Sequence, residues 1–222
     1  MRILIIIKFI IIFGLSIPTY SSNGVWEGIF DINGHGNYDF TGLINSKDAS
    51  AYTVKAKVVY SGKYEQNYNE FKWNLSMYLK DGTKFGTAEI NGKLIEKNIM
   101  SGKWVTEPAK DYGNIYLINN NNNVLDTSNL INKEWIATKT KIKQKIIIKN
   151  NKITGTDDNN CNYYGSIKPL NQKIYSANIE IASCGVSDGF YKGMAHIKKE
   201  NDKNLLFITA TNKNFSLFML LE

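Results

Sequence analysis

The chain has 222 residues and a formal net charge of +7, and 43% of its residues are hydrophobic, 12% aromatic and 21% charged. This composition excludes a disordered chain, a collagen-like chain and a coiled coil, and the length allows one domain or two small ones. Thirteen tyrosines and 17 glycines against three prolines favour β-structure.

The first segment, residues 1–21, has the order of a secretory signal peptide. Arg2 and Lys8 are followed by an apolar run, residues 9–17. After this run come Pro18 and the small residues Thr19 and Ser21. The run is short for a membrane-spanning helix. We therefore expect cleavage near Ser21 and a periplasmic or secreted protein with no lipidated cysteine and no later transmembrane helix. A retained N-terminal anchor is the alternative.

Apolar and polar residues alternate along much of the remaining chain, which is typical of half-buried antiparallel strands. The clearest examples are residues 52–60, 71–79 and 175–181. Glycine and asparagine pairs that suit tight turns break the pattern every 8 to 12 residues, as in a sandwich or a barrel. The strongest turn signals are Asp81-Gly82 and Asn91-Gly92, and the weaker ones are Ser61-Gly62, Ser101-Gly102 and Asn150-Asn151.

A run of five asparagines, residues 119–123, predicts a connection between two halves. We expect a β-rich first half at 22–118, a connection at 119–134 with a short helical turn near 126–134, and a β-rich second half at 135–222 that forms one domain with the first. Both halves begin near a tryptophan, Trp26 and Trp135, which is weak evidence for a duplicated unit. The predicted fold is all-β, a closed antiparallel β-barrel of about twelve strands.

The densest basic stretch lies in the second half. Its lysines recur at a spacing of two, which places them on one face of a strand opposite isoleucines. A surface for nucleic acid or anionic lipid is one interpretation, and the solvated face of an amphipathic strand is the preferred one. Because the only arginine is Arg2, we expect no nucleic-acid partner. The lysines are Lys139, Lys141, Lys143, Lys145 and Lys149.

Cys161 and Cys184 are the two cysteines of the chain. Both follow the signal sequence, so an oxidising compartment is available, and an even count favours one disulfide bond. A metal pair and a catalytic cysteine are the alternatives. The chain has only two histidines, His35 and His196, to support either.

No motif for a hydrolase nucleophile, a phosphate loop or a zinc protease is present, so we expect no enzyme, no cofactor and no metal. Asp31 begins a calcium-like loop, but Gly42 stands where the terminal glutamate is needed. Aromatic side chains could line a ligand pocket in the barrel, although packing in the core is the commoner role. These are Trp26, Trp73, Trp104, Tyr163 and Tyr191.

The segment from Ile153 to Ala195 resembles a group of small exported bacterial proteins, many of them lipoproteins, that have no assigned activity. The resemblance rests on Cys161, Cys184 and the sequence Gly189-Phe190-Tyr191-Lys192-Gly193 after a Trp-led first half. It implies a β-barrel with bridged cysteines. Asn23-Gly24-Val25-Trp26 also resembles, more weakly, the first motif of lipocalins, in which a tryptophan plugs the closed end of the barrel.

These observations lead to four hypotheses on function. The first is an exported, non-enzymatic barrel that binds a small apolar ligand, a peptide or an envelope component. The second is a protein-interaction module, either an inhibitor or a host-directed secreted factor. The third is a hydrolase whose site is dispersed in the sequence. The fourth is an outer-membrane barrel, because the alternation fits a lipid-facing belt, although residues 93–100 and 139–149 carry many charges for such a barrel. The sequence does not indicate the oligomeric state.

Overall fold

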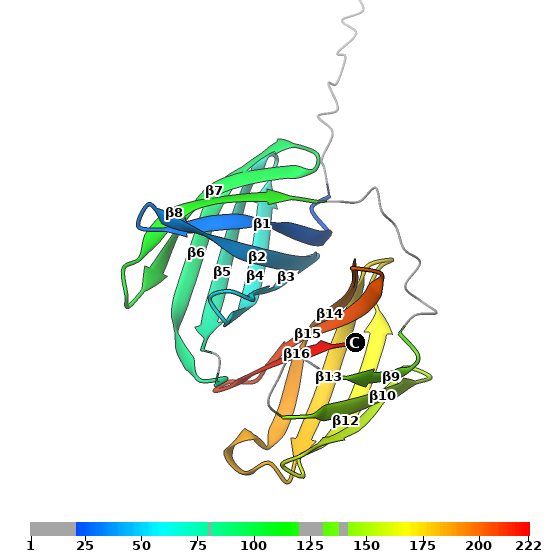
Figure 1. Cartoon of the computed structure of the whole chain (residues 1–222). Helices are drawn as coiled ribbons and strands as arrows, with labels where there is room; N and C mark the ends of the chain where they lie inside the picture. Colours follow the sequence, from blue (N-terminus) through cyan, green and yellow to red (C-terminus); the bar gives the residue numbers. More distant parts are fainter. Residues whose placement is uncertain (1–20, 80, 120–130, 138–141) are drawn as a thin grey trace, which may run out of the picture.

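The computed structural model describes residues 21–79, 81–119, 131–137 and 142–222. These residues form two eight-stranded antiparallel meanders, each with its strands in chain order (Figure 1). The predicted all-β fold with a closed antiparallel barrel is confirmed. The described residues form sixteen strands rather than about twelve, because each half builds a barrel of its own.

The first barrel closes through β1 and β8. Residues Glu27–Phe30 of β1 pair antiparallel with Ile115–Ile118 of β8. The strands are β1 (Gly24–Ile32), β2 (His35–Asn45), β3 (Asp48–Thr53), β4 (Val58–Asn67), β5 (Glu70–Tyr78), β6 (Lys84–Glu96), β7 (Ile99–Glu107) and β8 (Tyr112–Ile118).

The outer strands of the second sheet also meet. Ile136 and Glu222 exchange two backbone hydrogen bonds of 2.9 Å, which join β9 to the segment after β16. A short 3₁₀ turn, Gly185–Ser187, precedes β14. The strands are β9 (Glu134–Ile136), β10 (Gln144–Lys149), β11 (Lys152–Asp157), β12 (Asn162–Pro169), β13 (Ile174–Ala182), β14 (Gly189–Glu200), β15 (Lys203–Thr211) and β16 (Ser216–Leu221).

Three of the predicted turns lie inside strands. Gly62, Gly92 and Gly102 are paired on both sides within β4, β6 and β7. A Cβ on Gly92 would lie 2.3 Å from the Ser101 carbonyl oxygen, so these glycines allow close approach of neighbouring strands rather than a reversal of the chain.

Other expectations on local structure have mixed outcomes. Asn150 and Asn151 form the predicted tight turn, and both have positive φ. The predicted strand 52–60 is wrong, because a turn at residues 54–57 separates β3 from β4. Residues 1–20 of the predicted signal peptide and most of the helical turn predicted near 126–134 lie outside the described residues. Residues 131–133 are bends, and Glu134 begins β9.

The two barrels share local features as well as architecture. The indole N–H of Trp26 donates to the carbonyl oxygen of Ser22 (2.7 Å), and that of Trp135 donates to the carbonyl oxygen of Ile131 (3.0 Å). Each tryptophan lies in the first strand of its barrel and is fully buried, and each acceptor lies four residues earlier. The same tie therefore fixes the start of each barrel.

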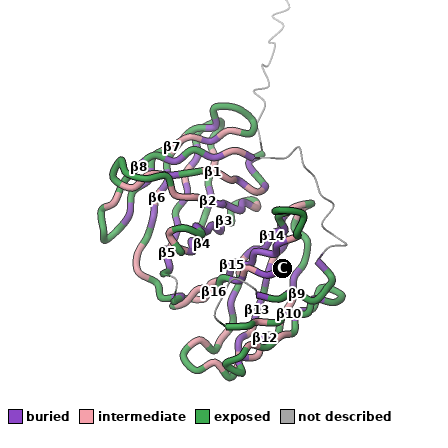
Figure 2. The backbone as a smooth tube through the Cα atoms, viewed as in Figure 1, coloured by how far each residue is buried: buried purple, intermediate pink, exposed green. Residues whose placement is uncertain are grey.

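The barrels also pack against each other through their outer faces. Leu43 contacts Ile174 and Met194, and Tyr52 contacts Leu205 and Phe207. These side chains are almost fully buried, and Figure 2 shows the exposed residues concentrated in the hairpin loops away from the cores. The contact therefore joins the barrels into one body.

Candidate binding surfaces

The interior of the first barrel is filled by its own side chains. Trp26, Trp73 and Trp104 belong to one buried cluster with Phe40 and Tyr64. Their rings meet edge-on: Trp73 lies 5.9 Å from Phe40 and 5.7 Å from Tyr64, measured between centroids. The three tryptophans thus lie inside the barrel, as their predicted role requires. Their rings pack against other buried aromatic side chains of the same cluster.

A hydrogen-bonded cluster seals the end of this barrel where the chain enters. The Ser22 hydroxyl donates to Gln66 Oε1 (2.5 Å), and the Tyr64 hydroxyl donates to the Ser22 oxygen (2.7 Å). Burial raises the pKa of Tyr64 to about 12, so its hydroxyl stays protonated and remains a donor. Ser22 itself is buried beside Trp26. This end of the barrel is closed by polar side chains that satisfy one another.

The second barrel is filled in the same way. Tyr163 and Tyr191 are buried inside it, with hydroxyls that donate to Asp157 Oδ2 (2.8 Å) and to the Ser187 carbonyl oxygen (2.9 Å). Burial raises the pKa of both hydroxyls. The predicted Cys161–Cys184 disulfide is confirmed. Its two cysteines lie close in sequence to Asp157 and Ser187, the acceptors of these hydroxyl groups. The two tyrosines therefore tie the core to the loops that the disulfide joins.

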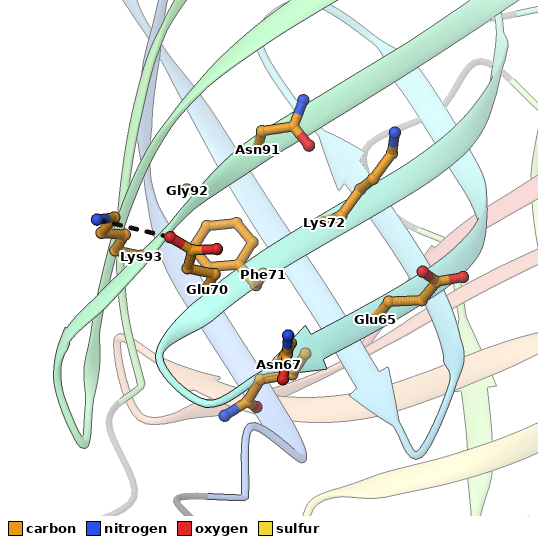
Figure 3. Close-up of a pocket in the computed structure, with 9 residues that line it drawn as sticks. Glu65, Asn67, Glu70, Phe71, Lys72, Asn91, Gly92 and Lys93 are labelled. Carbon is orange, nitrogen blue, oxygen red and sulfur yellow. Dashed lines mark ion pairs between the residues drawn. The ribbon is translucent and has the colours of Figure 1, made fainter.

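A groove of about 550 Å³ lies on the first barrel, over β4, β5 and β6 (Figure 3). Strand register brings its residues together: Glu65 pairs with Lys72, and Glu70 pairs with Lys93. Figure 3 shows the Glu70–Lys93 ion pair at one side of the groove and Glu65 at the other. The lining residues are Glu65, Gln66, Asn67, Glu70, Phe71, Lys72, Asn91, Gly92 and Lys93.

Both signs of charge occur in the groove. Lys72 Nζ lies 2.7 Å from Glu89 Oε2, and its hydrogen bond holds the pKa of Glu89 below its usual value. Lys93 Nζ lies 3.6 Å from Glu70 Oε1, and these two side chains are about two-thirds exposed. Exposed pairs of this kind contribute little to stability and are free to exchange partners. The groove therefore offers ammonium, carboxylate and amide groups to a polar ligand.

The sequence patterns did not identify the groove. Its charged residues are ordinary outward-facing members of alternating strands, and they converge only because β4, β5 and β6 pair in one particular register. The strand pattern of 71–79 was visible, but nothing in it fixes which residue of the next strand lies opposite. The one feature of the sequence that could have indicated the groove is the excess of charged and amide residues at alternate positions of these strands.

The outer face of the first barrel carries both charged pairs and exposed apolar residues, among them Ile29, Val105 and Tyr116. Lys63 pairs with Asp48 and Lys72 with Glu89 across neighbouring strands. A barrel that spans a membrane has an apolar outer band and a polar interior. The ion pairs of this chain lie on the outside of the barrel, and its largest aromatic cluster lies on the inside.

The two histidines lie in different surroundings. His196 is buried at the contact between the barrels, where its Nε2 lies 2.8 Å from the Tyr52 hydroxyl, and burial lowers its pKa to about 3. His35 is exposed at the start of β2. Within the described ranges, no group of three or more His, Cys, Asp or Glu residues could hold a metal ion. In the same part of the chain, no helix has the length and apolarity needed to cross a membrane.

Comparisons with known proteins add little to this picture. No family model matches the chain, and no curated protein matches it. Among solved structures, the chain is similar to a protein from Bacteroides fragilis that was provisionally described as an outer membrane protein. The two share 10% sequence identity with a TM-score of 0.31, and the match covers 90% of this chain and 96% of that one.

Proposed function

We propose that this chain is an exported, non-enzymatic protein-interaction module that binds its partner on the outside of its barrels. The observation that carries this proposal is the filled interior of both barrels. Aromatic and aliphatic side chains occupy the interiors, and this weighs against capture of a small apolar ligand there. Two packed barrels joined face to face make a rigid scaffold, and rigid scaffolds bind with little loss of conformational freedom.

The groove over β4, β5 and β6 is the proposed contact site. It is open, polar and of mixed charge, which suits the polar parts of a protein partner better than an apolar small molecule. Lys72, Lys93, Glu65 and Glu70 would pair with charges on that partner. Filled cores and the predicted export signal are consistent with a role as an inhibitor or a host-directed factor.

A blocking substitution tests this assignment. Asn67→Trp places a large ring in the groove, whereas Asn159→Trp places the same ring on an exposed loop of the second barrel. Pull-downs from envelope and host extracts should recover the same partner with the natural protein and N159W, and should lose it with N67W. Native mass spectrometry of the unreduced protein supplies the opposing outcome. A bound small molecule that survives N67W would overturn the proposal.

A further inference from the structure

The two barrels differ in charge. Residues 21–119 contain eleven lysines and eleven carboxylates, whereas residues 131–222 contain fourteen lysines and eight carboxylates. The excess positive charge of the chain therefore belongs to the second barrel. Such asymmetry is typical of a surface that meets an anionic partner.

Strand register collects part of this charge into one row on the outside of the second barrel. Its members face one another across six neighbouring strands, point away from the core, and include no carboxylate. We call it the lysine row. From β10 to β15 it contains Lys149, Lys152, Ser166, Asn178, Lys192 and Thr211.

The three lysines of this row are exposed and have no carboxylate within ion-pair distance among the residues that the structure describes. Lys149 and Lys152 stand directly opposite each other across the β10–β11 hairpin. Like charges at such positions repel, which destabilises the strand pair. An anionic partner would turn this repulsion into attraction.

A second row lies beside the first on the same outer face, and we call it the aromatic row. Tyr164 and Phe190 are 48% and 71% exposed and flank Glu180, which pairs with both. Two strand spacings separate the rings, or about 10 Å. The row consists of Ile147, Thr154, Tyr164, Glu180 and Phe190.

The disulfide loop holds Phe190 in place. Cys184 is bonded to Cys161, its backbone N–H donates to Asp188 Oδ1 (2.6 Å), and the Tyr191 hydroxyl donates to the Ser187 carbonyl oxygen (2.9 Å). Phe190 is the second residue of β14, directly after this loop. A large apolar side chain that is exposed on a strand held in this way is an anchor of the kind that binding sites use.

We propose that these two rows bind an acidic polysaccharide that lies across the strands of the second barrel. The lysines would pair with the acidic groups of the polymer, and the Tyr164 and Phe190 rings would stack on the apolar faces of its sugar rings. Asn178 and Glu180 would bond its hydroxyl groups. This site is separate from the groove of the first barrel and does not depend on it.

The residue types favour this partner over other polyanions. Glu180 between the two rings would accept hydrogen bonds from sugar hydroxyl groups, which DNA and a phosphate polymer do not offer. The described residues also include no arginine that could bind a phosphate through two hydrogen bonds. A flat anionic membrane would touch few strands of a curved barrel at once, whereas the lysine row extends over six. A neutral polysaccharide would leave the unpaired lysines without a role.

Equilibrium binding of the full exported chain in 150 mM NaCl tests the proposal, with polygalacturonate, chondroitin sulfate and neutral dextran as probes. We expect both acidic glycans to bind and dextran not to bind. The stronger of the two shows whether carboxylates alone or carboxylates with sulfates are recognised. Lys149→Gln with Lys152→Gln should weaken binding about tenfold and flatten its salt dependence. Lys97→Gln with Lys103→Gln, on the first barrel, should change neither.

The aromatic row separates specific recognition from simple attraction between charges. Tyr164→Ala and Phe190→Ala should each weaken binding about tenfold at every salt concentration, with the salt dependence unchanged. Both side chains are exposed, so circular dichroism should show an intact fold. The proposal is overturned if neither acidic glycan binds, if the ring variants bind normally, or if single-stranded DNA or anionic phosphatidylglycerol vesicles bind as tightly as the glycans.

Discussion

Trp26 and Trp73 are equally buried in the first barrel but differ in their hydrogen bonding. Trp26 Nε1 donates to the Ser22 carbonyl oxygen, while Trp73 Nε1 has no hydrogen-bond partner among the described residues. An unpartnered buried donor costs free energy, whereas a partnered one is roughly neutral or stabilising. The same substitution, tryptophan to phenylalanine, therefore removes a hydrogen bond at Trp26 and none at Trp73.

We predict that Trp26→Phe lowers the free energy of unfolding by about 1–2 kcal/mol more than Trp73→Phe. Both changes remove the same volume, but only the first leaves a buried carbonyl oxygen without its donor. Urea denaturation of the two variants measures the difference. Equal losses would mean that Trp73 Nε1 has a partner, such as a buried water.

At the residue scale, the sequence predicted which residues form the disulfide and lie inside the barrel, but it did not show whether the buried rings contact a ligand. The Cys161–Cys184 bond followed from an even count of cysteines in a chain with a predicted signal peptide, because no geometry is needed to pair the only two thiols of a chain. The placement of Trp73 in the barrel followed from the alternation of residues 71–79, whereas Trp26 was singled out by its likeness to a lipocalin motif and Trp104 by its aromatic ring. Their use as ligand contacts stays a prediction, since alternation places a ring inside the barrel without telling what fills the space beside it.

Among the strands, glycines mark the places where neighbouring backbones come closest. A Cβ on Gly62 of β4 would lie 1.9 Å from the Asn74 carbonyl oxygen, and one on Gly165 of β12 would lie 2.0 Å from the Asn178 carbonyl oxygen. Both glycines are in the fourth strand of their barrel, and both approach the carbonyl oxygen of an asparagine in the fifth. The sequence shows where the glycines lie, but it does not show which neighbouring backbone each glycine approaches.

We predict that Gly62→Ala and Gly165→Ala each destabilise the protein by about 3 kcal/mol, because the colliding group is backbone and cannot move aside. Gly34→Ala is the matched control. It has open space around its Cβ and a φ of +77°, so it should cost only about 1 kcal/mol. Thermal denaturation compares the three. A control that is as damaging as the others would assign the effect to backbone conformation instead.

The disulfide is the second feature at this scale. It joins Cys161 to Cys184, 23 positions apart, and removing it with a Cys161→Ala, Cys184→Ala double substitution should cost about 3 kcal/mol. Reducing agent should lower the denaturation midpoint of the natural protein and leave that of the variant unchanged. Thiol alkylation of the unreduced natural protein should label no cysteine, and two labelled thiols would contradict the bond.

For the whole molecule, the contact between the barrels is the feature that alternation could not predict. Outward-facing positions of β3, β14 and β15 carry Tyr52, His196 and Phe207, and a pattern of alternating burial predicts such positions to be exposed. They are buried because a second barrel covers them. Ser50 and Thr209 bond across the same contact (3.0 Å). Alternation along a strand predicts which residues face the inside of a barrel, but it does not show whether another barrel covers the outward-facing residues.

This contact makes stability depend on pH. Burial, and to a lesser extent the charge of Lys198, lowers the pKa of His196 to about 3 in the folded protein, from an unfolded value near 6.5. Its contribution to stability is therefore fully present above about pH 6.5. As pH falls from 6.5 towards 3, the unfolded state takes up a proton that the folded state does not, and stability decreases.

We predict that the free energy of unfolding falls by up to about 1.4 kcal/mol for each pH unit below 6.5. Urea denaturation at pH 7.5 and 5.5 measures this slope. His196→Phe should reduce the slope even if it changes stability at neutral pH, while His35→Gln, at an exposed position, should not. A slope that is unchanged in H196F would assign the effect to other groups.

The seam of each barrel has a further consequence. Gly24 and Asn119 lie next to each other where the first barrel begins and ends, and Ile136 and Glu222 are bonded to each other in the second. A chain that enters and leaves a barrel at one point can gain or lose the whole unit while the flanking segments stay where they are. In evolutionary terms, doubling such a barrel is an insertion that requires no change in the path of its neighbours.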